Sequence, residues 1–372
     1  MNVAERVVAF VVGLLIVQGV LRSAVRTVVV PRGETVWLSR VLFLGLSAVY
    51  DPLARRRHDP TLSHAVLARF APTALVLLAF VWAAGVILGF APMYWAVTEL
   101  DLLACFRLSG SSMTTLGLAA PPNAASTTLS IVEALLGLGV VALLIAYLPT
   151  IYGHFARREE EVLKFDSQAG SPPSPSVFLI RFHAIGWANQ LGQVWEPWER
   201  WFDELEESHT SHPSIALFRS QRVTDSWITT AGAVLDTAAL SQAAVDVPAQ
   251  PQAALTLRAG FLSLRAIARF YRLPVRDDPA PNDPISVTRA EFEQVLDEIA
   301  AAGVPVKADR DQAWRDYAGW RVNYDEALLA LSALCAAPVA RWSSDRCDRF
   351  HPPTLRHPKA WRIEPLDAPP SW

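Results

Sequence analysis

Two long apolar runs constrain the fold more than any other feature of the sequence. Ala71–Val97 contains 27 residues without a charge, and Ala134–Gly153 contains 20. A helix of about 20 apolar residues spans the hydrocarbon core of a bilayer, so each run predicts a transmembrane helix. Charged residues are sparse up to Gly153 and dense after it. We therefore expect an all-α protein with a membrane part followed by a soluble part, since strand-like alternation is absent.

The stretch between these runs is polar and contains glycine. Leu100–Ser112 predicts a short amphipathic helix, and the segment Met113–Ala119 follows it. Irregular backbone at membrane depth is tolerated only where protein buries it or water lines it. The pattern therefore indicates a pore loop, which enters the membrane and leaves it on the same side. The alternative is an ordinary Ser/Thr/Gly loop that joins two transmembrane helices.

Residues 71–158 resemble the pore-loop potassium channel superfamily, whose loop carries Thr-Val-Gly-Tyr-Gly or close variants. Thr114–Gly117 matches this pattern, whereas Leu118 replaces the usual Tyr and Ala119 replaces the second Gly. The resemblance implies a homotetramer that conducts a monovalent cation, potassium above others, through rings of backbone carbonyls. The residues it assigns to ion binding are Thr114, Thr115, Leu116, Gly117 and Leu118.

The two departures from the family pattern bear on the outer half of the filter. Leu118 lacks the tyrosine hydroxyl that braces the filter in the family. Ala119 would cost about 1–2 kcal/mol in the left-handed conformation, which Gly117 adopts freely. We therefore expect cation conduction with an atypical outer filter and less strict potassium selectivity.

Three residues of the second long helix are predicted to act in gating. Gly137 and Gly139 lie near the position where the family places a hinge. Pro149 removes a backbone donor near the cytoplasmic end and is expected to kink the helix. The alternative for the two glycines is that they allow close helix packing in the membrane.

Two charged residues are expected at membrane depth. Arg107 falls in the predicted pore helix, and Glu133 falls near the outer end of the second long helix. Such charges are costly in a membrane and are usually paired. We therefore predict that Arg107 and Glu133 bond to each other behind the filter as filter support. The alternative is that both face the outer water.

Basic residues flank the two long runs at their far ends. Arg55–Arg57 precede the first run, and Arg157–Arg158 follow the second. The positive-inside rule makes both ends cytoplasmic, so the loop between them faces outward. We accordingly expect a multi-pass protein of the plasma (inner) membrane with a cytoplasmic C-terminal domain.

The N-terminal region has a shorter apolar run. Val7–Leu21, extended through Val30, predicts a retained membrane anchor, whose single crossing would leave the N-terminus outside. Val41–Tyr50 is too short to span a bilayer and predicts an interfacial amphipathic helix.

The predicted organisation has four parts. They are N-terminal membrane and interfacial helices at 1–58, a pore domain at 59–160, a linker at 161–177 and a cytosolic helical domain at 178–372. Within the pore domain we expect a transmembrane helix at 70–97, a pore helix at 100–112, a filter at 113–119 and a transmembrane helix at 127–156. The soluble helices are predicted at Ser176–Leu191, Trp195–Ser208, Thr224–Ala244, Ala253–Arg272, Thr288–Ala302 and Asp309–Ala336.

Two features of the soluble domain are candidate sites. His209 and His212 would share a helix face and could bind zinc, but Pro213 ends any helix here, which favours a hydrogen-bonded structural role. Tryptophans at spacing three predict a core or an interface, with a ligand cage as the alternative. These tryptophans are Trp195, Trp198 and Trp201.

Composition excludes several classes of function. The net charge of −3 and the absence of a basic stripe argue against nucleic-acid binding. The sequence has no phosphate loop and no nucleophile–base pair, so we expect no enzyme activity, no cofactor, no metal site and no small-molecule ligand. The expected partners are the bilayer and further copies of the chain. The resulting hypothesis is a tetrameric cation channel that its C-terminal domain gates. The alternatives are a non-conducting membrane-anchored sensor or scaffold, and a membrane-tethered metal-dependent enzyme using His209 and His212.

Overall fold

The computed structural model describes residues 2–28, 37–55, 59–186, 192–351 and 362–363. The chain divides into two compact units. Unit 1 comprises residues 1–47 and 69–153, and unit 2 comprises residues 48–68 and 154–372. Arg56 and Arg57, two of the basic residues that precede the first apolar run, lie outside the described residues.

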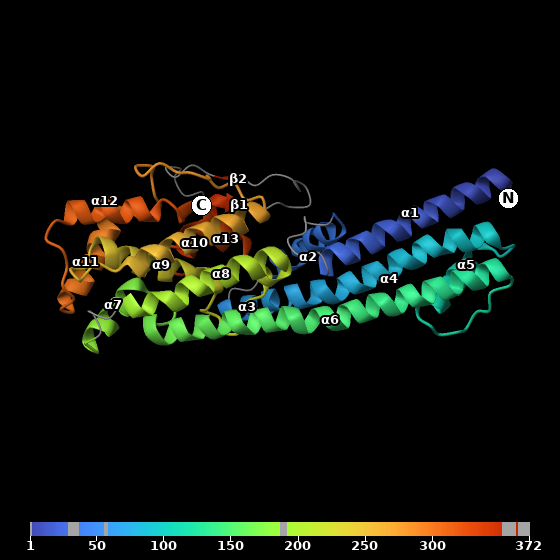
Figure 1. Ribbon diagram of the computed structural model, residues 1–372, viewed down its shortest axis with the longest axis horizontal. Helices are drawn as coiled ribbons and strands as arrows, with labels where there is room; N and C mark the ends of the chain where they lie inside the picture. The colour runs from blue at the N-terminus through green and yellow to red at the C-terminus, as the bar shows by residue number, and fades with distance from the viewer. Residues whose placement is uncertain (1, 29–36, 56–58, 187–191, 352–361, 364–372) are drawn as a thin grey trace. The chain divides into compact units, whose positions relative to one another are not determined.

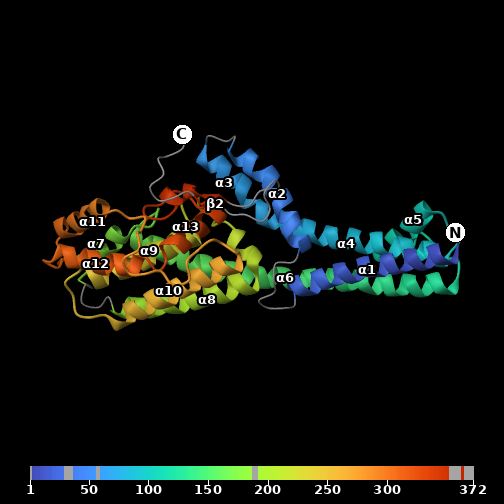
Figure 2. The ribbon, with the colours of Figure 1, turned by 90° about the horizontal axis from the view of Figure 1, so that it is seen from above.

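Unit 1 is built from long apolar helices. They are α1 (Val3–Val28), α4 (Phe70–Val97) and the first part of α6 (Ala124–Ala169), with the short α5 (Leu102–Met113) between α4 and α6. The three long helices run side by side (Figures 1 and 2). Each is long and apolar enough to cross a membrane, as the apolar runs of the sequence predicted.

Small residues let α1 and α4 pack closely. Gly13 faces Gly89 so tightly that a Cβ on Gly13 would collide with the carbonyl of Gly89. Farther along, the indole Nε1 of Trp82 donates to the Ser23 hydroxyl over 3.2 Å. Because higher residue numbers on α1 meet lower numbers on α4, the two helices are antiparallel. Glycine at the contact allows the two helix backbones to approach closely. Helices in a membrane associate through such close packing rather than through hydrophobic exclusion.

Two shorter helices separate α1 from α4 along the chain. They are α2 (Trp37–Arg55) and α3 (Pro60–Ala68). The apolar part of α2, Val41–Ala54, is shorter than a bilayer-spanning helix. Helix α2 contains the short helix predicted at Val41–Tyr50 but extends beyond it at both ends, and its interfacial position stays a prediction.

Unit 2 is a helical bundle around α9. Its helices are α7 (Pro175–Ala184), α8 (Trp195–Ser211), α9 (Trp227–Ala243), α10 (Pro251–Phe270), α11 (Arg289–Ala301), α12 (Arg310–Arg321) and α13 (Asp325–Leu334), with short 3₁₀ turns η2 (Pro213–Leu217) and η3 (Ser344–Arg349). Helix α9 consists mainly of Ala, Thr, Ser and Val. Other helices cover these side chains, so α9 is buried on nearly every face. The predicted stripe on α8 packs into the same core, and its members are Trp195, Trp198 and Trp201.

The structure corrects three details of the predicted soluble part. Helix α6 continues to Ala169, so most of the predicted linker at 161–177 is helical, and only residues 170–174 separate α6 from α7. The helix predicted at Asp309–Ala336 is two helices, because the chain turns between Arg321 and Asp325. Two-residue strands, β1 (Phe350–His351) and β2 (Arg362–Ile363), pair antiparallel in the C-terminal domain, for which we predicted helices alone.

Candidate functional site

Helix α5 begins where α4 ends and packs back against it. Its N-cap is Asp101, whose carboxylate accepts from the backbone N–H of Ala104 over 2.9 Å. One turn before its end, the Ser109 hydroxyl approaches the carbonyl of Ile87 on α4 at 3.3 Å. The 12-residue helix thus starts beside the end of α4 and runs back along it.

Two contacts fix how far α5 reaches along α6. The Asn123 side chain, which caps the start of α6, donates to the carbonyl of Val97 at the end of α4 over 2.8 Å. At the other end of α5, the Met113 carbonyl lies against Gly137, where a Cβ would collide with it. Thirteen residues separate Ala124 from Gly137, which corresponds to roughly 20 Å along a helix axis. The chain between α4 and α6 therefore extends along α6 as far as Gly137 and then returns to the first residues of α6.

The turn after α5 has a left-handed backbone at two residues. Thr115 has a φ of 54° and Gly117 has a φ of 69°. The Leu116 N–H donates to the Ser111 carbonyl over 2.9 Å, and the Ser111 hydroxyl accepts from Ala119 N–H over 3.2 Å. The expected left-handed strain at Ala119 is therefore wrong: it falls on Thr115, because the turn tightens directly after the helix.

The side chains of this turn are poorly covered within one chain. Leu116 is 63% exposed and Leu118 is 80% exposed. The hydroxyls of Thr114 and Thr115 donate to nearby carbonyls, those of Gly110 and Thr114, each over 2.7 Å. The ion-binding roles of Thr114, Thr115, Leu116, Gly117 and Leu118 need several copies around one axis and stay predictions.

Glu133 is the buried polar centre behind this turn. Its side chain has no exposed surface. One carboxylate oxygen accepts from the Tyr94 hydroxyl over 2.8 Å, and the other accepts from the Ser109 hydroxyl over 2.5 Å. The neighbouring Ser112 and Ser130 hydroxyls bond to each other over 2.7 Å. The carboxylate thus joins α4, α5 and α6 at one point, which is how a buried carboxylate is made tolerable.

The predicted pair between Arg107 and Glu133 is wrong. Glu133 bonds to Tyr94 and Ser109 instead, while the Arg107 side chain is exposed within the chain. The reason is helical geometry: residues two positions apart on a helix lie about 200° apart, so Arg107 points away from the face on which Ser109 meets Glu133.

The two glycines of α6 have different surroundings. Gly137 is buried against the end of α5, whereas a Cβ on Gly139 would meet nothing within 4 Å. The close approach at Gly137 agrees with the packing alternative. Helix α6 continues through Pro149. The gating roles of Gly137, Gly139 and Pro149 stay predictions.

We expect Gly137→Ala and Gly139→Ala to differ sharply. The added methyl at position 137 meets a backbone carbonyl, so the end of α5 must shift and the thermal unfolding midpoint of the purified protein should fall. The methyl at position 139 has open space and should change the midpoint little. Equal effects of the two substitutions on unfolding in detergent would contradict this packing.

The two histidines that are candidate zinc ligands make other contacts. His209 is buried, its Nδ1 lies 2.9 Å from the Leu205 carbonyl, and its ring lies 4.5 Å from that of Trp227. Burial lowers the pKa of His209 well below its usual value, so the imidazole is neutral. The ring of His212 faces His154 at 5.3 Å. Among the described residues, no cluster of three His, Cys, Asp or Glu side chains could hold a metal ion.

Sequence reasoning missed a buried ionic network in unit 2. Arg321 has no exposed surface; its Nη1 donates to both oxygens of Asp236 at 2.8 Å, and its Nε donates to Asp325 at 2.8 Å. The hydroxyls of Tyr317 and Tyr324 also donate to Asp236. Only the i,i+4 spacing of Arg321 and Asp325 was visible in the sequence, because Asp236 lies on α9, far away in the chain.

Comparison with known proteins adds no relative: no family model, no curated protein and no solved structure matches this chain.

Proposed function

We propose that this chain is one subunit of a tetrameric cation channel of the plasma (inner) membrane. In this proposal α4, α5, the turn after α5 and α6 form the pore module, and the backbone of Thr114–Leu118 binds the permeant ion. The orientation follows from the basic residues Arg157 and Arg158 beyond the apolar part of α6, which favour a cytoplasmic side for that end.

One observation carries the proposal. A 12-residue helix ends beside Gly137, roughly 20 Å along an apolar helix long enough to span a membrane, and a glycine-containing turn then returns to the level of Asn123. A lipid-exposed irregular segment at that depth would leave backbone groups without partners. Such a segment is tolerable where it lines a water-filled path shared with other subunits, and a pore provides this.

The electrostatics of the segment favour a cation. The C-terminal end of a helix carries about half a unit of negative charge, and α5 ends directly before the turn. The left-handed residues Thr115 and Gly117 alter the direction of neighbouring carbonyls. Carbonyl oxygens that replace the hydration shell of an ion are the basis of potassium binding in pore loops. Potassium is therefore the permeant ion that we propose.

The uncovered apolar surface of unit 1 supports assembly from several copies. Leu116 and Leu118 are exposed at the turn, and one chain cannot enclose a central path. Helix α6 also presents an exposed apolar face, which suits lipid and neighbouring subunits. Its members are Ile131, Val132, Leu135, Leu138, Val141, Ile145 and Leu148.

Ion flux into liposomes tests the proposal directly. The full chain, purified as an oligomer and reconstituted, should let potassium enter faster than sodium and faster than calcium. Gly117→Ala should reduce the flux strongly because a Cβ at a φ of 69° is strained and the strain recurs in each subunit. Gly19→Ala on α1, outside the proposed pore module and with free space for the added Cβ, serves as the matched control.

The alternatives predict different outcomes. A stable oligomer that passes no cation would reject conduction and favour the membrane-anchored sensor or scaffold. A flux that Gly117→Ala leaves unchanged would reject the assignment of the filter to Thr114–Leu118.

A further inference from the structure

The part of α6 that belongs to unit 2 begins at His154 and contacts the turn η2 through its first residues. The ring of Phe155 lies 5.7 Å from that of Phe218, measured between the ring centres. About one helical turn later, the buried Arg158 donates from Nη1 to the Ile215 carbonyl and from Nη2 to the Phe218 carbonyl, each over 2.8 Å. These contacts fasten α6 to η2 within unit 2.

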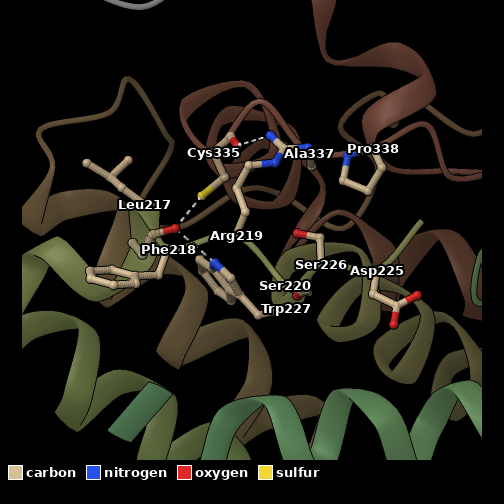
Figure 3. A pocket seen from close by; sticks show the side chains of 11 residues that line it. Leu217, Phe218, Arg219, Ser220, Asp225, Ser226, Trp227, Cys335, Ala337 and Pro338 are labelled. Atoms are coloured by element: carbon tan, nitrogen blue, oxygen red, sulfur yellow. Dashed lines mark hydrogen bonds between the residues drawn. The ribbon is translucent and has the colours of Figure 1, made fainter. Parts of the chain in front are cut away.

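The other side of η2 is held by the helical bundle. The indole Nε1 of Trp227, on α9, and the thiol of Cys335, at the end of α13, both donate to the Ala216 carbonyl over 3.2 Å (Figure 3). The hydroxyl of Tyr271, which follows α10, donates to the Pro213 carbonyl. If the contacts with α6 are lost, η2 therefore stays attached to the bundle.

Two histidine rings meet where α6 contacts η2. His212 ends α8 and is the N-cap of η2, and its ring centre lies 5.3 Å from that of His154. Both side chains are half-buried, and the buried ring of His209 lies about one turn earlier on α8. Imidazoles ordinarily gain a proton between pH 8 and pH 5, so the charge of this contact changes in that range.

The surrounding charges balance one imidazolium better than two. Glu207 on α8 favours a proton on His212, whereas His154 disfavours it. Arg158 is always charged and pairs with Glu159 over 2.8 Å, so that carboxylate already has a partner. The other charged or titratable groups on the neighbouring turns and helices are Arg157, Glu206, His209, Arg219, His64, Tyr271 and Cys335.

The folded contact resists protonation. Burial lowers the pKa of His212, and His154 lowers it further. Burial also lowers the pKa of His209. Above the usual pKa of histidine, these rings are neutral in the folded and the unfolded chain alike. As pH falls below that value, the unfolded chain takes up protons that the folded chain resists, so the contact becomes less stable in acid.

We propose that His154 and His212 form an acid-sensitive latch between α6 and η2. At neutral pH the two uncharged rings pack together, and Arg158 holds the carbonyls of η2. In acid, protons on both rings place like charges beside Arg158, and α6 separates from η2. The latch lies within unit 2, so it does not depend on whether the chain conducts cations.

Carbon-13 NMR of the full chain in detergent, with labelled histidine, reports the proton on each ring. Spectra of His154→Gln and His212→Gln assign the two signals. His154→Gln should raise the pKa of His212, because it removes a neighbouring group that becomes positive. His154→Glu should raise it further, because a carboxylate then faces the ring. An unchanged pKa of His212 in both variants would overturn the proposal.

Hydrogen exchange measures the separation itself. Peptides that cover residues 209–218 and the adjoining part of α6 should exchange faster, relative to peptides of α9 in the same sample, at pH 5 than at pH 8. The comparison within one sample removes the intrinsic effect of pH on exchange. In His154→Glu this ratio should change little with pH. A ratio that pH does not alter in the native protein would contradict the latch.

A histidine elsewhere in unit 2 provides the matched control. His183 lies on α7 beside Gly303, and His183→Gln should keep the native response to acid. Thermal unfolding at pH 8, where the latch histidines are neutral, establishes that each variant is folded. An acid response that persists unchanged in His154→Gln, His212→Gln and His154→Glu would overturn the proposal.

Discussion

Replacing Arg321 by methionine should strongly destabilise unit 2. Arg321 is fully buried between Asp236 and Asp325, so its loss leaves two buried carboxylates without a counter-ion. Breaking a buried pair in this way typically costs about 3–5 kcal/mol, about a fifth or more of the stability of an ordinary domain. Denaturant unfolding of the full chain, followed by tryptophan fluorescence, measures the loss.

An exposed arginine of the same pattern is the control. Arg200 pairs with Glu196 at i,i+4, as Arg321 does with Asp325, but its side chain is 69% exposed. Arg200→Met should barely change the unfolding midpoint because water screens surface ion pairs. Similar losses in the two variants would contradict the importance that we assign to burial.

The loss in Arg321→Met should also depend on pH. Burial raises the pKa of Asp236, and Arg321 opposes this effect in the native protein. Without Arg321 the folded-state pKa of Asp236 rises further above its unfolded value, so the folded variant binds a proton more readily than the unfolded chain does. Stability then falls as pH rises through that pKa. The difference between variant and native protein should therefore be smaller at pH 5 than at pH 8.

Glu133→Leu should loosen the turn after α5. The substitution leaves the Tyr94 and Ser109 hydroxyls without their acceptor in a buried position, at a cost of about 1–3 kcal/mol each in every subunit. We expect a less heat-stable oligomer in detergent and, in liposomes, a reduced preference for potassium over sodium. Glu133→Gln retains an acceptor and should have a smaller effect.

Two comparisons separate this network from a general packing defect. Combined with Tyr94→Phe, Glu133→Leu should show a non-additive loss because both remove the same hydrogen bond. Arg107→Gln should leave oligomer stability unchanged, since Arg107 does not contact Glu133. A strong effect of Arg107→Gln together with additive losses for Tyr94 and Glu133 would reject the contacts described above.

The sequence located the helices of both units because their signals are local. The uncharged run Ala71–Val97 forms α4 with nearly the same bounds, and the helix predicted at Thr288–Ala302 forms α11 with Thr288 as its N-cap. The break between Arg321 and Asp325 was missed, because the apolar pattern continues across it. Helix ends that tertiary contacts determine carry a weaker local signal.

The candidate site was predictable only in part. Its position between two apolar helices followed from composition, and the charge of Glu133 near the end of an apolar run predicted a paired residue there. The hydrogen-bond partners of Glu133 could not be predicted, because the choice among Arg107, Ser109 and Tyr94 depends on which face of α5 meets α6.

By itself, the sequence determined the all-helical class, the apolar helices and the polar turn between two of them, because run length and periodicity are properties of neighbouring residues. Only the tertiary structure decided what each buried polar group contacts. It placed Glu133 with Tyr94 and Ser109, Arg321 with Asp236, and the Met113 carbonyl against Gly137. These contacts join residues that are between 24 and 85 positions apart in the sequence. Contacts between residues so far apart depend on the packing of whole helices rather than on any local pattern.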